Sequence, residues 1–335
     1  MIVVWRITQR CNLSCPFCAY DRDSSWPRRE ADASVIRLFG GVLAEYQRAT
    51  NDRVLVSWIG GEPFLFHGLS ALTVLFTTKL GLRVSTTTNG TALRSASVRE
   101  HILTHYAELT ISVDGIGPVH DELRGWHGGY AALREAVNSL AEAKRKHKQG
   151  PRLRANVVLM RQTISDFERL CVELAAWGIE EITFNQLGGR DRPDFFPAHR
   201  LLPENAAWLT GEISRLRSRL ARLGVRLNGS DTYLLRIQAS SRDENISVAN
   251  CHPGERFLFV NEEGIVSPCS FTTRGYGIPL EELNGIEALQ NLPEHFARLR
   301  RESRLATCED CHSTQVFEKF AVESATSGKA GGFKL

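Results

Sequence analysis

Apolar, β-branched segments alternate with amphipathic segments along residues 1–188 of this 335-residue chain. The apolar segments have the length of buried strands, and the amphipathic segments have the spacing of helices. We predict strands at residues 2–7, 53–59, 82–88, 108–113, 153–159 and 181–184, and helices at about 33–50, 70–79, 97–106, 131–148 and 164–177. This order predicts an α/β protein in which helices cover a parallel sheet, with ligands at the carboxyl ends of the strands.

The second part of the chain has a different texture. The alternation is predicted to end near Gly189, and residues 189–227 are interpreted as a linker with one bridging helix at about 203–223. Residues 228–323 contain short strands, turns and four of the eight cysteines, which indicates a small second domain. Residues 324–335 are rich in Gly, Ser and Lys, a composition that predicts a disordered tail.

Composition and charge exclude several classes of function. The net charge of +3 is spread along the chain, and the basic run Lys144–Lys148 fits the solvated end of a helix, so nucleic-acid binding is not indicated. No apolar run approaches the ~18 residues of a membrane span, and Arg6 does not fit a secretion signal. We therefore expect a cytoplasmic protein, in which eight cysteines indicate metal binding or catalysis more than disulfides.

Three cysteines, Cys11, Cys15 and Cys18, directly follow the first predicted strand. Their spacing lets one loop wrap a cubane iron–sulfur cluster and ligate three of its irons, which leaves the fourth iron open for chemistry. A structural zinc site needs four ligands, and only three are present here. A disulfide would leave one thiol over and would not fit the expected compartment. The spacing therefore favours a catalytic cluster.

The arrangement Cys-x3-Cys-x-aromatic-Cys after the first strand resembles the signature of the radical S-adenosylmethionine (SAM) superfamily. The resemblance implies that the open iron of a 4Fe–4S cluster binds the amino and carboxylate groups of SAM. It also implies that one electron cleaves SAM to a 5′-deoxyadenosyl radical, which abstracts hydrogen from the substrate. Phe17 would lie against the adenine. An electron donor such as flavodoxin or ferredoxin is implied as a partner.

Two further segments end the second and third predicted strands. Residues 58–63 contain Gly60, Gly61, Glu62 and Pro63, which resemble the family motif that holds the methionine ammonium group of SAM. Glycines allow close backbone approach, and a carboxylate pairs with a cation, although a simple Gly-Gly turn is an equal alternative. Residues 86–91 contain Thr88 and Asn89 and resemble the Thr-Asn-Gly segment of the family.

The fourth and fifth strands supply weaker candidates. Ser112 begins a run that is similar to the Ser-x-Asp-Gly…His-Asp…Arg-Gly pattern of peptide- and sugar-modifying members, and it would contact the ribose or carboxylate of SAM. Asn156 is a candidate for the ribose hydroxyls, or else a hydrogen-bonded strand residue. His120 and Asp121 equally fit a helix cap, and we assign them no catalytic role.

A second set of cysteines lies near the end of the chain: Cys251, Cys269, Cys308 and Cys311. Residues 257–268 read as a β-hairpin, and from spacing alone the four thiols fit either zinc or an iron–sulfur cluster. The pattern is similar to the twitch domain, a shortened SPASM domain appended to radical SAM cores. That resemblance implies one auxiliary 4Fe–4S cluster with every iron ligated by protein, suited to electron transfer or to structure.

The eighth cysteine, Cys171, falls on an apolar helical stripe with Ile164, Phe167 and Leu174. We expect this stripe to pack on the outer face of the sheet, so that Cys171 fills the core and does not reach the site. No thiol then remains to return hydrogen to a substrate radical. Tyr20 or Tyr233 could donate instead, but nothing in the sequence supports either.

Together these features predict a partial (β/α)6 TIM-like barrel of the radical SAM type over residues 1–188, with a small α+β twitch domain over 228–323. We expect a net oxidation, such as cross-linking or dehydrogenation, with the auxiliary cluster as electron acceptor.

A ribosomal peptide is the favoured substrate, and a small aminocyclitol- or sugar-like intermediate is the alternative. Because the chain begins on its first strand, a separate protein would have to deliver a peptide. A non-catalytic zinc or electron-transfer protein would not need the segments around Glu62 and Asn89.

Overall fold

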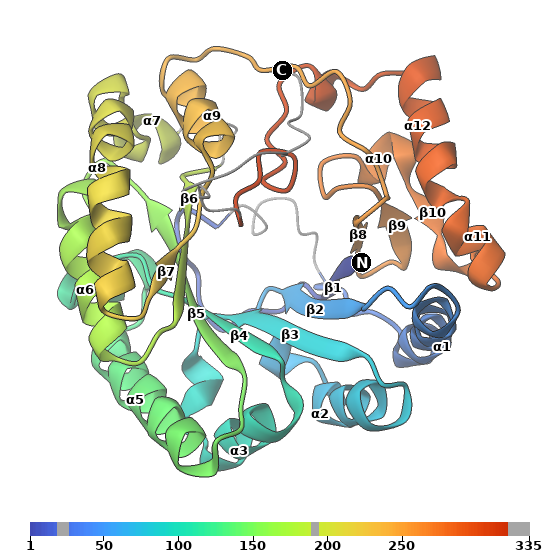
Figure 1. Ribbon diagram of the computed structural model, residues 1–335, viewed down its shortest axis with the longest axis horizontal. Helices are drawn as coiled ribbons and strands as arrows, with labels where there is room; N and C mark the ends of the chain where they lie inside the picture. The colour runs from blue at the N-terminus through green and yellow to red at the C-terminus, as the bar shows by residue number, and fades with distance from the viewer. Residues whose placement is uncertain (19–26, 189–193, 321–335) are drawn as a thin grey trace.

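The computed structural model describes residues 1–18, 27–188 and 194–320. Tyr20 and the predicted tail at 324–335 lie outside these residues. In the described part of the chain, one sheet curves around a central lumen, with helices on its outer face (Figure 1). The strand order is β10-β9-β8-β1-β2-β3-β4-β5-β6-β7.

The middle of the sheet is a partial parallel barrel in which strands adjacent in the sequence are also adjacent in space. Its strands are β1 (Ile2–Thr8), β2 (Leu55–Gly60), β3 (Arg83–Thr88), β4 (Glu108–Ser112), β5 (Arg152–Leu159), β6 (Glu181–Gln186) and β7 (Arg226–Leu227). The predicted parallel sheet is confirmed, and each of the six predicted strands agrees with the observed one to within about two residues.

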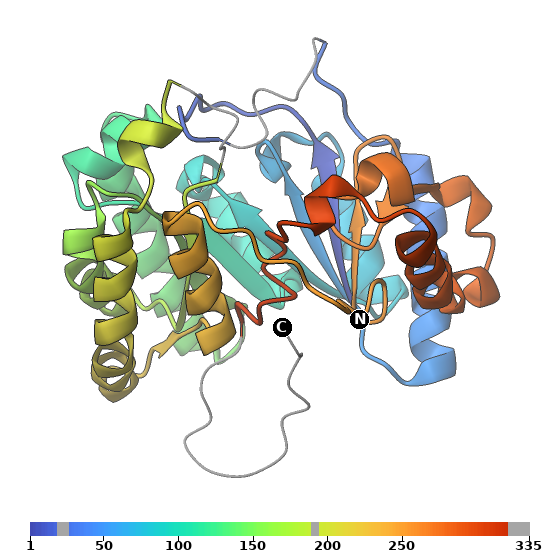
Figure 2. The same ribbon diagram turned by 90° about the horizontal axis from the view of Figure 1, so that it is seen from above.

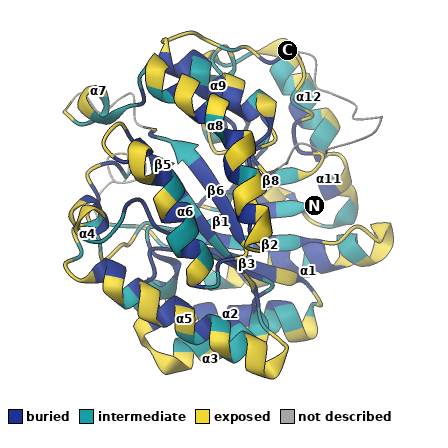
Figure 3. Ribbon diagram, turned by 60° about the vertical axis from the view of Figure 1, so that its left-hand side comes forward, coloured by how far each residue is buried: buried dark blue, intermediate teal, exposed yellow. Residues whose placement is uncertain are grey.

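Most of the helices that connect these strands are amphipathic, with buried residues facing the sheet and exposed residues facing outward (Figure 3). In order along the chain, they are α1 (Ala33–Thr50), α2 (Leu69–Val74), which continues as a π-helix over Leu75–Lys79, α3 (Ala96–His105), α4 (Pro118–Arg124), α5 (Gly129–His147), α6 (Phe167–Ala176), α7 (Phe196–His199) and α8 (Pro203–Arg222). The barrel therefore has an apolar outer layer, and its lumen is free to be polar.

Helix α1 shows how local sequence and packing combine. Its N-cap is Asp32, whose carboxylate accepts from the backbone N–H of Ser34 at 2.7 Å. Its buried face places the Phe39 ring 5.8 Å from Trp5 of β1, edge to face. Gly40 lies where a Cβ atom would come within 2.5 Å of the Phe76 ring. The glycine therefore allows close packing between α1 and the helix after β2.

The prediction that the alternation ends near Gly189 is wrong. Helix α8 leads into β7, which pairs in parallel with β6 and adds one more helix and strand to the barrel. A strand of two residues is too short to show a hydrophobic period, so sequence patterning could not find it. The expectation of mainly short strands after residue 228 also missed helix α9 (Asp231–Ser241), which begins at the N-cap Ser230.

The C-terminal part of the chain joins the same sheet. The predicted hairpin is confirmed as β8 (Phe257–Val260) and β9 (Ile265–Ser267), with Gly264 at a φ of 74° in its turn. Strand β8 pairs in parallel with β1, and β10 (Ile278–Pro279) pairs with β9. The helices of this part are α10 (Thr273–Tyr276), α11 (Ile286–Gln290) and α12 (Leu292–Glu302).

Residues 312–320, here called the C-terminal strap, cross the open side of the barrel between the β7 and β8 edges (Figures 1 and 2). The carbonyl oxygen of Phe317 accepts from Ser230 Oγ at 2.8 Å and from Thr232 Oγ1 at 3.1 Å. The Phe317 side chain is buried. These contacts anchor the strap at the start of α9. Among the described helices, none is both long enough and apolar enough to cross a membrane.

Candidate active site

A cavity of about 550 Å³ fills the barrel lumen. Every second residue of each strand faces it, as the alternation of strand side chains requires, and many of these residues are Ser, Thr or Asn. The predicted site residues that line it are Cys11, Cys15, Phe17, Cys18, Gly60, Gly61, Thr88, Asn89, Ser112 and Asn156. Glu62 and Pro63 lie outside the lining.

The first three cysteines share one wall of this cavity at the carboxyl end of β1. The backbone N–H of Leu13 lies 3.4 Å from the Cys11 sulfur, and the N–H of Cys18 donates to the Cys15 carbonyl at 3.0 Å. Burial raises the pKa of Cys11, and it raises the pKa of Cys15 to about 11. The charge of Cys18 contributes to both increases, which is consistent with three neighbouring sulfurs.

Gly60 and Gly61 bring the end of β2 into contact with the start of the cysteine loop. A Cβ atom at Gly60 would lie 2.4 Å from the carbonyl oxygen of Thr8, and one at Gly61 would lie 2.2 Å from that of Arg10. The N–H of Gly61 donates to Thr8 at 2.8 Å, and that of Glu62 donates to Arg10 at 2.7 Å. The glycines therefore position the backbone that carries Cys11.

The Glu62 carboxylate is fully buried and bonds within the protein. It accepts from Thr88 Oγ1 at 2.7 Å, from the N–H of Asn89 at 2.8 Å and from the N–H of Phe64 at 3.3 Å. Burial raises its pKa, and these donors oppose the rise. The side chain joins the ends of β2 and β3, and Pro63, which is buried, begins a 3-10 turn directly after it. For this carboxylate, the pairing with the SAM ammonium group stays a prediction. For the backbone of the loop, a contact with SAM stays a prediction.

Asn89 connects the end of β3 to the cysteine loop. Its Nδ2 donates to Asn12 Oδ1 at 3.0 Å and lies 3.7 Å from the Cys11 sulfur, while its Oδ1 accepts from the N–H of Thr91 at 2.9 Å. Thr88 Oγ1 accepts from the N–H of Gly90 at 3.0 Å and is already used as a donor to Glu62. Both residues therefore orient the neighbourhood of Cys11.

Arg124, which the sequence analysis left without a role, lies beside Cys15. Its guanidinium pairs with the fully buried Asp114 at 2.5 Å, lies 3.9 Å from the Cys15 sulfur, and stacks 5.1 Å from the Phe17 ring. The Asp-Gly…Arg-Gly spacing in the sequence was the signal that could have identified Arg124.

Asp121 does act as a cap, since its carboxylate accepts from two backbone N–H groups at the start of α5. His120 is buried, which lowers its pKa to about 4.

Ser112 and Asn156 are direct neighbours across β4 and β5 and both face the lumen. The Oδ1 of Asn156 accepts from Thr183 Oγ1 at 3.1 Å, from Asn185 Nδ2 at 3.0 Å and from Lys319 Nζ at 3.0 Å. The strand interpretation of Asn156 therefore has direct support, and its contact with a ribose stays a prediction. Lys319, from the C-terminal strap, was missed by the sequence analysis because nothing in its local pattern distinguishes it.

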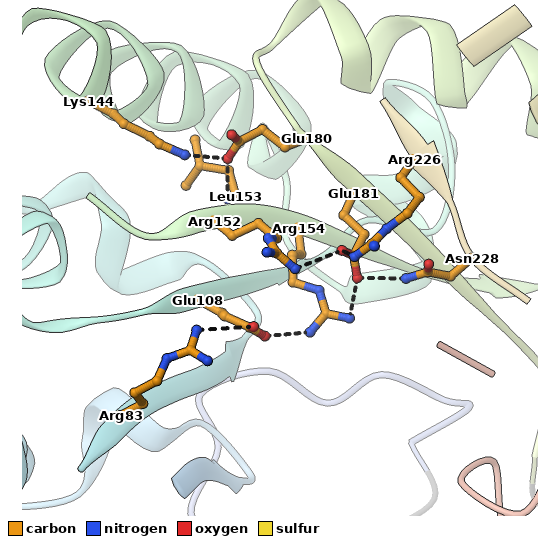
Figure 4. A network of polar contacts seen from close by, with 10 residues as sticks. All are labelled: Arg83, Glu108, Lys144, Arg152, Leu153, Arg154, Glu180, Glu181, Arg226 and Asn228. Carbon is orange, nitrogen blue, oxygen red and sulfur yellow. Dashed lines mark hydrogen bonds and ion pairs between the residues drawn. The ribbon is translucent and has the colours of Figure 1, made fainter. Parts of the chain in front are cut away.

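The opposite end of the lumen, at the amino ends of the strands, is lined by a charged network (Figure 4). Arg154 bridges Glu108 at 2.9 Å and Glu181 at 2.6 Å. Glu181 also accepts from Asn228 at 2.6 Å and pairs with Arg226. Arg83 and Arg152 complete the set. Single charges at the starts of separate strands gave no sequence motif, so this network was not predicted.

The second four cysteines face a separate cavity of about 500 Å³. It is lined by Cys251, Cys269, Cys308 and Cys311, and it shares Ile2 and Gln315 with the lining of the lumen. Burial raises the pKa values of Cys251 and Cys269, and raises that of Cys311 to about 11, and in each case charges of other cysteines in the set contribute. In residues 1–18, 27–188 and 194–320, no three His, Cys, Asp or Glu side chains are arranged to hold a single metal ion.

Glu262, in the turn between β8 and β9, joins the C-terminal hairpin to the first cysteine loop. Its buried carboxylate pairs with Arg6 of β1 and accepts from the side-chain amide of Gln9, two residues before Cys11. The two cysteine-bearing parts of the chain are therefore connected by side chains as well as by the pairing of β8 with β1.

Cys171 is fully buried in α6 and lines neither cavity, so its predicted place in the core is confirmed. Burial raises the pKa of its thiol. Tyr233 is also buried, and its hydroxyl donates to the carbonyl of Phe184 at 3.1 Å. It does not line the lumen. Tyr20 lies outside the described residues.

Comparisons with known proteins agree with the motifs. A family model described as the Radical SAM superfamily matches residues 5–174. The sporulation killing factor maturation protein SkfB of Bacillus subtilis is 29% identical over 140 residues, which cover 41% of this chain and 32% of SkfB. The PqqA peptide cyclase of Xanthomonas campestris pv. campestris (strain B100) is 24% identical over 326 residues, which cover 94% of this chain and 80% of the cyclase. The crystal structure of Streptococcus suis SuiB bound to precursor peptide SuiA has a TM-score of 0.67 at 16% identity, and covers 95% of this chain and 70% of SuiB.

These matches differ in what they establish. The match to SkfB spans about a third of that protein, and the likeness to SuiB at this identity shows the fold alone. The family model, by contrast, covers just over half of the chain and includes the first three cysteines and the ends of β1 to β5. The chain therefore belongs to the radical SAM superfamily, whose enzymes use a 4Fe–4S cluster and SAM.

Proposed function

We propose that Cys11, Cys15 and Cys18 hold the 4Fe–4S cluster and that SAM lies beside it at the carboxyl ends of the strands. The three sulfurs share one cavity wall, and the N–H of Leu13 and the guanidinium of Arg124 point toward two of them, as suits thiolate ligands of a cluster. When bound, this pair supplies a 5′-deoxyadenosyl radical that takes a hydrogen atom from a substrate. The lumen between the cysteines and the charged network is the space available to that substrate.

The four remaining clustered cysteines are proposed to hold one auxiliary 4Fe–4S cluster. All four face one cavity, and the charge of Arg300 opposes the rise in the pKa of Cys251, as a cation near a thiolate does. This cavity adjoins the lumen at Ile2 and Gln315. Such closeness supports an electron-accepting role for this group during turnover.

The proposed reaction is a net oxidation of the substrate. The observation that carries it is the disposition of the thiols: all eight cysteines are described, seven face the two cavities, and Cys171 is sealed in the core. The hydroxyl of Tyr233 is also buried and bonded to the backbone. No described thiol is therefore free to return hydrogen to a substrate radical in the lumen, and loss of an electron and a proton is favoured instead.

A ribosomal peptide is the proposed substrate, modified by cross-linking or dehydrogenation. This choice is supported by the names of the similar proteins, which are a maturation protein, a peptide cyclase and an enzyme bound to a precursor peptide. A flavodoxin or ferredoxin would supply the reducing electron, and a separate protein could deliver the peptide.

The test uses the full chain, reconstituted without oxygen and incubated with SAM, a reductant and each short peptide encoded beside its gene. We expect one peptide to lose two hydrogen atoms and to gain no deuterium at the attacked carbon in deuterium oxide. The variant Cys171→Ala should retain turnover, because this thiol reaches neither cavity. A product of unchanged mass that carries deuterium, together with loss of turnover in Cys171→Ala, would refute the oxidative proposal. Conversion of a sugar or amine and of no peptide would refute the choice of substrate.

A further inference from the structure

The C-terminal strap places one amine inside the barrel. Lys319 follows Phe317, whose carbonyl is anchored to Ser230 and Thr232, and the backbone N–H of Lys319 donates to Thr314 at 3.0 Å. The side chain of Lys319 then enters the lumen, which it lines together with Gln315 and Phe320. The position of the amine is therefore set by the same segment that carries Cys308 and Cys311 just upstream.

The surroundings of this amine are unusual for a lysine. Lys319 is only 6% exposed, and its Nζ donates to Asn156 Oδ1 at 3.0 Å. The Nζ also lies 5.2 Å from the centre of the Phe320 ring, and the Arg154 guanidinium lies 5.0 Å from the centre of the same ring. Within the described residues, no carboxylate forms an ion pair with Lys319. A buried ammonium without an anionic partner is costly.

The charged groups around Lys319 favour its neutral form. The charge of Arg154 on β5 acts on Lys319, and both carboxylates of the network, Glu108 on β4 and Glu181 on β6, are already paired with Arg154. Arg226 on β7 pairs with Glu181 as well, and Arg152 and Arg83 add further positive charge. Burial, together with the charge of Arg154, lowers the pKa of Lys319 to about 7. A large fraction of the amine is then neutral near neutral pH, with a lone pair available.

We propose that Lys319 is the catalytic base of the reaction in the lumen. Asn156 orients the amine by accepting one of its hydrogens, and the nitrogen lone pair accepts a proton from the substrate. The inference rests on the proposed oxidation. In that reaction the substrate gives one hydrogen atom to the 5′-deoxyadenosyl radical, one electron to the auxiliary iron–sulfur cluster and one proton to Lys319. The new bond or double bond forms as the electron and the proton leave.

The first experiment needs no substrate. The reconstituted enzyme is labelled with trace acetic anhydride between pH 5 and 11, and the modification of each lysine is measured by peptide mass spectrometry. Exposed Lys79 on the outside of the barrel is the internal control. We expect the labelling midpoint of Lys319 to lie near pH 7, well below the ordinary lysine value of 10.5. A Lys319 midpoint at that ordinary value would overturn the proposal, because Lys319 would be an ammonium at working pH. A complete lack of labelling in the folded enzyme would overturn it too, because the amine could not be reached.

The second experiment uses the peptide found in the test of the proposed function. In Lys319→Ala, the ratio of oxidised peptide to 5′-deoxyadenosine should fall by about 10²-fold, the usual loss for a missing general base. Added methylamine should restore part of this ratio, more at pH 9 than at pH 6. The Lys319→Arg variant should stay defective, because a guanidinium keeps its charge but cannot accept a proton. Full activity in Lys319→Arg would overturn the proposal and show that the site needs a positive charge.

The failures of the two proposals can be told apart. If the wild-type product keeps its mass and gains deuterium, the oxidation is wrong whatever Lys319 does. If the wild-type enzyme oxidises the peptide and Lys319→Arg does so equally well, only the role of Lys319 is wrong. The labelling experiment decides the protonation state of the amine in either case.

Discussion

Replacement of Lys319 by methionine should stabilise the protein, and by more at low pH than at high pH. Methionine keeps the length of the side chain and removes the amine that the folded chain holds in a buried site without an ion-pair partner among the described carboxylates. The pKa of Lys319 is lowered from 10.5 to about 7 on folding. Above pH 10.5 the amine is neutral in both states, so its charge has no effect on stability.

The size of the effect follows from proton linkage. Between pH 10.5 and about 7 the unfolded chain binds a proton at Lys319 and the folded chain does not, so the wild type loses stability as pH falls. With about 1.36 kcal/mol per pKa unit, the destabilisation is about 1.4 kcal/mol at pH 9.5 and about 4.6 kcal/mol at pH 6.5. The lost hydrogen bond to Asn156 costs about 1 kcal/mol in the variant at either pH. The variant should therefore gain about 3 kcal/mol more at pH 6.5 than at pH 9.5.

Thermal unfolding of the reconstituted proteins, followed without oxygen at both pH values, measures this difference. A change of 3 kcal/mol corresponds to a further increase in Tm of roughly 4 °C for a chain of 335 residues. The clusters are common to both proteins, so their own pH dependence cancels in the comparison. Lys79→Met on the surface is the matched control and should show no such trend. A Tm difference between Lys319→Met and the wild type that is the same at both pH values would refute the reasoning.

Three further predictions concern the cysteine loop. Replacing its three cysteines by alanine should leave about four irons per chain and abolish SAM cleavage; retained cleavage would contradict the assignment. Gly61→Ala places a Cβ 2.2 Å from the carbonyl of Arg10, so iron content should fall by about four, whereas Gly41→Ala, with nothing within 4 Å, should leave it unchanged. Glu62→Ala leaves the buried hydroxyl of Thr88 and a backbone N–H without an acceptor, at about 1–3 kcal/mol each, and should lower both stability and SAM affinity. Equilibrium dialysis and denaturant unfolding measure these two effects, and no change in either would contradict the bridging role of Glu62.

The elements whose formation is local could be predicted from the chain. The six strands and the longer helices up to residue 188 followed from hydrophobic period, because that period reports which side chains must be buried on each element. The short helix α4 was not predicted. The cysteine loop was also recognisable, because the spacing of Cys11, Cys15 and Cys18 is a property of one short segment. The hairpin at 257–267 was found for the same reason.

The direction of individual side chains was harder to predict. Glu62 accepts hydrogen bonds from the end of β3, which its motif did not reveal, and its predicted pairing with SAM stays a prediction. The glycines beside it were expected to approach SAM, and they make contact with the backbone of Thr8 and Arg10. The two glycines in the sequence indicate that the backbone comes close to another group at this point. Which group that is depends on how the neighbouring strands pair.

The sequence by itself determined the parallel barrel, the two sets of cysteines and the polar residues at the strand ends. Only the tertiary structure decided that β8 pairs with β1, that Arg124 reaches Cys15, and that the strap carries Lys319 to Asn156, a residue 163 positions away. The physical reason is that periodicity and spacing describe a chain over a few turns or strands. Contacts between distant segments depend instead on how the sheet curves and closes, which is set by the packing of the whole molecule.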